Sequence, residues 1–134
     1  MALMDLFGKK QVSGQSNPFD LQFSFHPLRI SAHKPDYIEL TIILKNVSSE
    51  EQLTSFTVTV PHGLGFEPTG LSQEREIRLS FLKPGEEKRF KINIYGSQRT
   101  RPGDYAVKMH VASHYRNYGY VLNELRKSFS LRVV

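Results

Sequence analysis

The amino-acid sequence predicts an all-β fold, in which two antiparallel sheets built from about seven to eight short strands form a sandwich. The stretch 84–111 carries the clearest pattern, because apolar and polar residues alternate in it on both sides of the turn Pro102-Gly103. Such alternation places one apolar face on each strand. The pattern recurs along the chain between turn signals, and no long stretch has the period of a helix.

Several stretches show this alternation and are expected to be strands. Pro27 interrupts the first of them, and because proline lacks an N–H donor, that strand is expected to lie at a sheet edge or to change sheets there. Leu64 and Phe66, in a loop rich in glycine and proline, are expected to close one end of the core. The expected strands are Phe19–Ile30, Ile38–Leu44, Leu53–Val60, Ile77–Phe81, Phe90–Ile94, Tyr105–Val111 and Leu125–Val133. The expected core comprises Phe23, Ile38, Leu40, Ile42, Phe56, Val58, Ile77, Leu79, Phe90, Ile92, Tyr105, Val107, Met109, Phe129 and Leu131.

Composition limits the possible classes of protein. The 134 residues are enough for one ordinary domain, and 39% of them are hydrophobic, as in a folded globular chain. The absence of cysteine excludes disulfides, thiol chemistry and cysteine zinc sites. No apolar run reaches the roughly 18–20 residues of a membrane span, and the N-terminus lacks the pattern of a signal peptide. We therefore expect a cytoplasmic location.

Residues 1–18 differ from the rest of the chain and are expected to form a lead-in, so that the sandwich domain comprises residues 19–134. Residues 11–17 are polar and mostly small, as in a linker. Residues 1–10 are expected to be either a frayed terminus or a short amphipathic segment. In the second case this segment contacts a membrane surface or a partner, and the protein is peripheral to the membrane.

The net charge of +5 is unevenly distributed along the chain. Residues 1–83 carry 8 Lys/Arg and 9 Asp/Glu, a net −1, whereas residues 84–134 carry 10 and 4, a net +6. This leaves a binder of nucleic acid or another anionic polymer open as an alternative function. The basic residues are spread over several strands, however, and only residues 114–120 interleave them with aromatic residues, as a single-strand binder would.

Three motifs have a physical reason for their residue types. Pro84-Gly85 and Pro102-Gly103 suit tight turns. Asn46, at the end of a strand, is expected to form hydrogen bonds with its local backbone. Tyr105, just after Pro-Gly-Asp, is expected to anchor the start of its strand as a tyrosine corner does.

In their order along the chain, these motifs resemble prokaryotic Ig-like modules of the CARDB (cell-adhesion-related) type and related domains appended to some glycosidases. The resemblance covers about residues 36–115 and rests on Leu44-Lys45-Asn46-Val47-Ser48, Leu82-Lys83-Pro84-Gly85-Glu86 and Arg101-Pro102-Gly103-Asp104-Tyr105. It implies an Ig-like β-sandwich. Since these features specify a fold and carry no chemistry, the function has to be argued from the surface.

No catalytic motif is present in the sequence: it contains no G-x-S-x-G, no H-E-x-x-H and no glycine-rich phosphate loop. We therefore expect neither enzyme activity nor a cofactor. His110 and His114 share one face of a strand, with Glu124 as a conceivable third metal ligand. Two residues four apart on a strand lie about 13 Å apart, too far for one ion, so these histidines are expected to be solvated and not to bind metal.

The stretch 114–120, HYRNYGY, links the last two expected strands and is the most informative exposed segment. Tyr115, Arg116, Tyr118 and Tyr120 belong to the residue types enriched at binding hot spots. We expect either that they bind a partner or that one or two of the tyrosine rings cover the end of the core. Stacking of the tyrosines on sugar rings is a third possibility, and it would make the chain a carbohydrate-binding module.

The final strand contains no proline and is expected to lie at a sheet edge, with only Ser128, Ser130 and Arg132 pointing outward to guard it. We expect this edge and the adjoining loop to bind another protein by β-augmentation, or to pair with a second copy of the chain. The sequence thus predicts a non-enzymatic protein-interaction or assembly module with an Ig-like fold.

Overall fold

The structure is a computed structural model, and it describes residues 17–134. The predicted lead-in, residues 1–18, lies outside this part except for its last two residues, and so does the predicted membrane contact through residues 1–10. Among the described residues, no helix is long and apolar enough to cross a membrane. The strands are β1 (Phe19–His26), β2 (Arg29–Ile30), β3 (Asp36–Asn46), β4 (Gln52–Thr59), β5 (Glu74–Leu82), β6 (Glu87–Gly96), β7 (Gly103–His114) and β8 (Val121–Val133).

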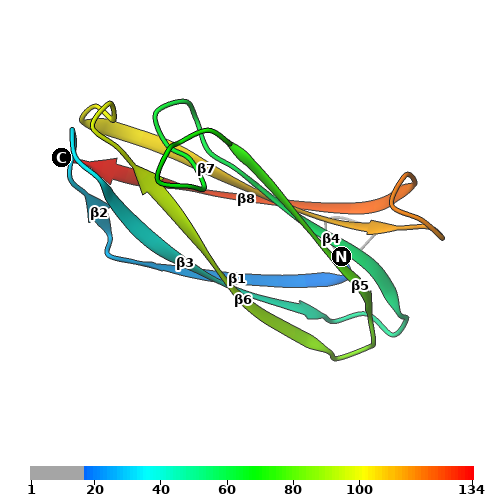
Figure 1. Ribbon diagram of the computed structural model, residues 1–134. Helices are drawn as coiled ribbons and strands as arrows, with labels where there is room; N and C mark the ends of the chain where they lie inside the picture. The colour runs from blue at the N-terminus through cyan, green and yellow to red at the C-terminus, as the bar shows by residue number, and fades with distance from the viewer. Residues whose placement is uncertain (1–16) are drawn as a thin grey trace, which may run out of the picture.

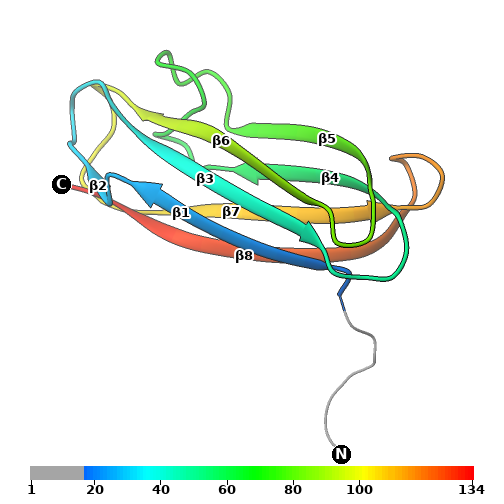
Figure 2. The same cartoon turned by 90° about the horizontal axis from the view of Figure 1, so that it is seen from below.

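The strands form two sheets that lie face to face (Figures 1 and 2). One sheet has three strands in the order β1-β3-β6, and the other has five in the order β2-β8-β7-β4-β5. Every pair is antiparallel except the short parallel pairing of β2 with β8. The predicted all-β, two-sheet sandwich is therefore confirmed, with β2 as a small departure from a purely antiparallel arrangement.

The chain changes sheets at Pro27, one of the two outcomes that the proline predicted. β1 forms one edge of the three-stranded sheet. The chain then crosses over, and β2 lies beside the end of β8 in the five-stranded sheet, with Arg29 opposite Arg132. This crossing closes one side of the sandwich near the C-terminus.

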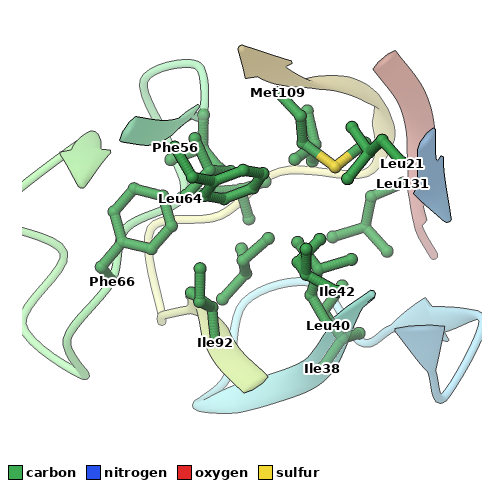
Figure 3. Close-up of a cluster of buried hydrophobic side chains, with 14 of the residues drawn as sticks. Leu21, Ile38, Leu40, Ile42, Phe56, Leu64, Phe66, Ile92, Met109 and Leu131 are labelled. Atoms are coloured by element: carbon green, nitrogen blue, oxygen red, sulfur yellow. The ribbon is translucent and has the colours of Figure 1, made fainter. Parts of the chain in front are cut away.

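The core lies between the two sheets, where the alternating apolar residues meet. Ile38, Leu40 and Ile42 point inward from β3 toward Phe56 of β4 and Met109 of β7 (Figure 3). Every residue of the predicted core is either buried or packs half-buried against the buried cluster. The two loop residues expected to close the core, Leu64 and Phe66, are buried as well.

Two of the predicted turn contacts are present. The side chain of Asn46 has no exposed surface, and its amide nitrogen donates to the carbonyls of Glu50 and Leu82, each at 2.8 Å. The hydroxyl of Tyr105 donates to the carbonyl of Arg101 at 2.8 Å, which is the contact that a tyrosine corner makes. Both contacts bind a strand end to the backbone of a neighbouring turn.

Candidate partner-binding surface

The β7–β8 connection, residues 115–120, lies at the end of the sandwich opposite the C-terminus (Figure 1). The Tyr115 N–H donates to the Tyr120 carbonyl at 2.9 Å, and the Tyr120 N–H donates to the Asn117 carbonyl at 3.2 Å. The side-chain oxygen of Asn117 also accepts the Gly119 N–H at 2.8 Å. The backbone of this loop is therefore closed by its own hydrogen bonds, as in a defined turn.

Tyr118 folds back from the loop onto the outer face of the five-stranded sheet. Its hydroxyl accepts the backbone N–H of Ser80 on β5 at 3.1 Å. Its ring meets the ring of His114 edge-on, with the centroids 5.1 Å apart, and the guanidinium of Arg78 lies 4.6 Å from the ring centre. Tyr118 thus connects the loop to β5, the strand at the opposite edge of the sheet from β8 and β2.

Beneath Tyr118, Ser55 and His114 form a buried polar pair. The Ser55 hydroxyl lies 2.8 Å from His114 Nε2, and the two residues are only 5% and 8% exposed. The expectation of a solvated histidine at position 114 is therefore wrong. The outer face of a sheet is normally open to water, but here the loop covers it with the Tyr118 ring.

A serine hydroxyl beside a histidine is also the arrangement of a hydrolase nucleophile and its base. In the described part of the chain, however, the other ring nitrogen of His114, Nδ1, is buried without a hydrogen-bond partner. No carboxylate therefore orients the ring, and burial keeps the Ser55 hydroxyl from a substrate. The pair is structural.

Large apolar side chains gather at this end of the sandwich, and we call Phe81, Tyr115, Tyr120, Val121 and Leu122 the hairpin patch. Each is between 50% and 63% exposed. Strand register accounts for two of them, because Phe81 pairs with Leu53, Leu53 pairs with His114, and His114 pairs with Val121. One row across the sheet therefore has buried residues in its middle and exposed apolar residues at both ends.

The predicted loop residues divide into two groups. Tyr118 is engaged within the chain and holds the loop in place. Tyr115 and Tyr120 are exposed members of the hairpin patch, and Arg116 lies 5.0 Å from the centre of the Tyr115 ring. Tyr118 therefore covers buried residues, on the outer face of the sheet and not at the end of the core, and binding of a partner by Tyr115, Arg116 and Tyr120 stays a prediction.

The predicted residues of β8 divide in the same way. The guanidinium of Arg132 donates to Asp104 at 3.1 Å, and the Arg132 backbone pairs with β2. Ser128 and Ser130 are exposed and have neither of these contacts. The edge of β8 away from β7 is therefore paired at Arg132, where the sequence predicted an open edge.

Many basic residues of the C-terminal half lie beside carboxylates. Arg126 and His110 both contact Glu124, at 3.1 and 2.6 Å. On the three-stranded sheet, Lys91 lies 3.3 Å from Glu39. Pairing of this kind lowers the positive potential that a polyanion would meet. His110 contacts Glu124 whereas His114 contacts Ser55, and within residues 17–134 no group of three potential metal ligands occurs.

No protein-family model matches the chain. No curated protein sequence matches it either.

Solved structures do match. A fragment of Escherichia coli alpha-2-macroglobulin, from domain MG7 to the C-terminus, has a TM-score of 0.64 and 16% identity, and the match covers 89% of this chain and 17% of that one. The C-terminal domain of wzt has a TM-score of 0.57 and 11% identity, with 89% and 75% of the two chains covered. A CARDB domain from Pyrococcus furiosus, solved with di-metal ions, has a TM-score of 0.51 and 20% identity, with 91% and 95% covered.

These likenesses show an immunoglobulin-like β-sandwich. The CARDB resemblance inferred from the turn motifs is supported at the level of this fold. The chain spans only 17% of the alpha-2-macroglobulin fragment that it matches. The fold hosts many unrelated functions, so the surface of this chain has to supply the functional argument.

Three members of the hairpin patch were not predicted from the sequence: Phe81, Val121 and Leu122. The apolar pair Val121-Leu122 follows directly after Tyr120 and was a readable signal. Phe81 gave no signal, because it belongs to a strand whose other apolar residues point inward. Its exposure follows from a register shift between β4 and β5 at Thr54/Ser55.

Proposed function

We propose that this chain is a non-enzymatic protein-interaction module that binds a partner protein with the hairpin patch. The observation that carries this proposal is a concentration of exposed apolar residues. Of the ten large hydrophobic side chains that are exposed in the described residues, five lie in this patch. Exposed apolar residues scattered singly need no explanation, whereas a cluster of them marks an interaction site.

The residue types in the patch suit protein recognition. Tyr115 and Tyr120 offer large ring surfaces with a hydroxyl at the tip, and Arg116 lies beside the first of them. Tyrosine and arginine dominate binding hot spots because they combine apolar area with hydrogen-bonding capacity. A partner with an apolar surface bordered by a carboxylate would complement them.

The loop is also held in place before any partner arrives. Tyr118 connects it to Ser80 and Arg78 on β5, and the Asn117 side chain closes its turn. An ordered loop loses less conformational freedom on binding than a mobile one. The alternative of an anionic polymer would require unpaired basic residues, whereas many of those in the C-terminal half lie beside carboxylates.

The proposal is tested with full-length protein and two double variants, after circular dichroism has shown that all three are folded. The variant Tyr120→Ser/Leu122→Ser removes two members of the hairpin patch. The control variant Tyr37→Ser/Leu71→Ser changes two side chains of the same types, which are also exposed, at 51% and 82%, but lie elsewhere in the chain. Proteins captured from the source organism by each bait are compared quantitatively, and the candidate partner is then purified.

Direct titration of the purified partner decides the outcome. We expect the patch variant to bind at least about tenfold more weakly than the parent, because hot-spot residues supply most of the binding energy. The control variant should bind like the parent. Equal affinity of all three proteins for every captured partner would overturn the proposal.

A further inference from the structure

The outer edge of β8 contains a short gap in its strand pairing. On one side, β7 pairs with β8 along its length. On the other side, β2 reaches only Arg132 and Val133. Nearer the hairpin, the Asn17 side chain donates to the carbonyl of Glu124 at 3.0 Å. Between these two contacts lie residues 126–130, which we call the edge window, and no strand among residues 17–134 pairs with its outer side.

Backbone groups in the edge window point outward at every second residue. The Glu124 carbonyl binds Asn17, and the Val134 N–H donates to the Ile30 carbonyl at 2.9 Å, so both groups point away from β7. The direction alternates along a strand, and the register with β7 is regular between these residues. Arg126, Ser128 and Ser130 therefore direct their N–H and C=O groups to the open side.

The edge window is weakly protected against strand addition. It contains no proline and no bulge, which are common means of blocking an edge. An inward-pointing charge is another such means, and here it is Lys127, whose ammonium donates to the carbonyl of Leu21 on β1 at 2.7 Å. Ser128 and Ser130 are exposed and carry no charge.

The length of the window argues against a second copy of β8 as the occupant. β8 has 13 residues, and a second such strand would run past the window into the place that β2 occupies. A short extended segment meets no such obstacle, because its chain is free to turn away at both ends. Five residues suffice to pair with the window.

Each face beside the window favours a different side-chain type. On the outer face, Arg126 and Arg132 each lie beside a carboxylate, Glu124 and Asp104, so Lys108 gives this face its excess positive charge. Lys108 lies on β7 directly opposite Ser128.

On the inner face lies an aromatic stack. The ring of Phe129 lies 4.3 Å from the ring of Phe25 and 5.3 Å from that of Phe23. All three are half-buried.

We propose that the edge window binds an extended segment of a partner protein in which acidic and apolar residues alternate. Main-chain hydrogen bonds join the segment to Arg126, Ser128 and Ser130, and supply affinity that does not depend on side chains. The acidic residues lie beside the basic outer face, and the apolar residues lie beside Phe129. This inference rests on the open strand edge and is independent of the hairpin patch.

The test uses full-length protein and a fluorescent five-residue peptide of alternating glutamate and valine. We expect this peptide to bind and to slow hydrogen exchange at the amides of Ser128 and Ser130. A peptide of alternating lysine and valine should bind at least about fivefold more weakly at low ionic strength, because charge complementarity is lost. Methylating the backbone nitrogens on one side of the glutamate peptide should abolish binding, whereas methylating the other side should not.

Two protein variants separate this site from general electrostatic attraction. Arg126→Glu should weaken binding of the glutamate peptide severalfold, and the control Arg75→Glu, on the opposite edge strand β5, should not. Equal binding of the two methylated peptides, or equal effects of the two variants, would overturn the proposal. So would free full-length protein in which the Ser128 and Ser130 amides are already protected, because residues 1–16 or a second copy would then occupy the window.

Discussion

The Ser55 hydroxyl lies 2.8 Å from Nε2 of His114, and both side chains are buried although they point to the outer face of a sheet. The contact gives a hydrogen-bond partner to the Ser55 hydroxyl and to one ring nitrogen of His114. The second ring nitrogen of His114 is without a partner among the described residues. Buried polar atoms cost stability unless they are bonded, so the remaining hydrogen bond matters more than an exposed one would.

Ser55→Ala should therefore destabilise the protein by about 1–3 kcal/mol, because it leaves the buried His114 ring without any hydrogen bond. Urea unfolding followed by circular dichroism measures the change. Thr57→Ala is the matched control, since Thr57 is the next outward residue on β4 and is only half-buried. Its cost should stay within about 0.5 kcal/mol. Equal costs for the two variants would mean that the Ser55–His114 contact adds no stability.

Tyr118→Phe should loosen the loop without changing the fold, because the ring keeps its contacts with His114 and Arg78 while the Ser80 N–H loses its acceptor. We expect hydrogen exchange at the Ser80 amide to become about three- to tenfold faster. Tyr120→Phe changes the same group at an exposed position and should leave Ser80 unaffected. Unaltered exchange in both variants would show that Tyr118 does not hold β5.

Ser72→Ala should raise the pKa of Glu67. The Ser72 hydroxyl and the Ser72 N–H both donate to the Glu67 carboxylate and hold the pKa of Glu67 below its ordinary value. The hydroxyl has the larger effect on this pKa. Glu86 is an internal reference, because its lowered pKa comes first from the Lys83 N–H and should not move. NMR titration of both carboxyl groups measures the shift.

The sign of the effect on stability follows from the lowered pKa of Glu67. A carboxyl with a lower pKa in the folded state stabilises that state above its unfolded pKa, and the stabilisation is lost as the pH falls through the folded pKa. The parent protein should thus lose more stability than Ser72→Ala on acidification. An identical Glu67 titration in the two proteins would contradict the assigned contact.

Local patterns were enough to predict much of the fold. In β3, apolar residues recur at every second position from Ile38 to Leu44, and a period of two can bury one face only if the chain is extended. The contacts of Asn46 with Glu50 and of Tyr105 with Arg101 each join residues four positions apart, so they were predictable as well, whereas the bond from Asn46 to Leu82 depends on the tertiary structure. Pro27 marked the change of sheets because its missing N–H is a local property.

The candidate site was less predictable, because its properties depend on which strands become neighbours. His114 looked solvated in the sequence and is buried, since a loop residue four positions later folds over it. Phe81 joins Val121 in one patch only through the register of β5, β4, β7 and β8. The backbone of Arg132 was expected at an open edge but pairs with β2. β2 has only two residues, too few for an alternating pattern to predict it.

The sequence by itself determined that this protein is a β-sandwich, because alternation, turn residues and the absence of helical periods act through local geometry. Only the tertiary structure decided which exposed residues form surfaces. The edge window is open because β2 and Asn17 stop on either side of it, and Phe81 belongs to the hairpin patch because a register shift turns it outward. Contacts between residues far apart in sequence depend on register and sheet order, which a single strand's pattern does not specify.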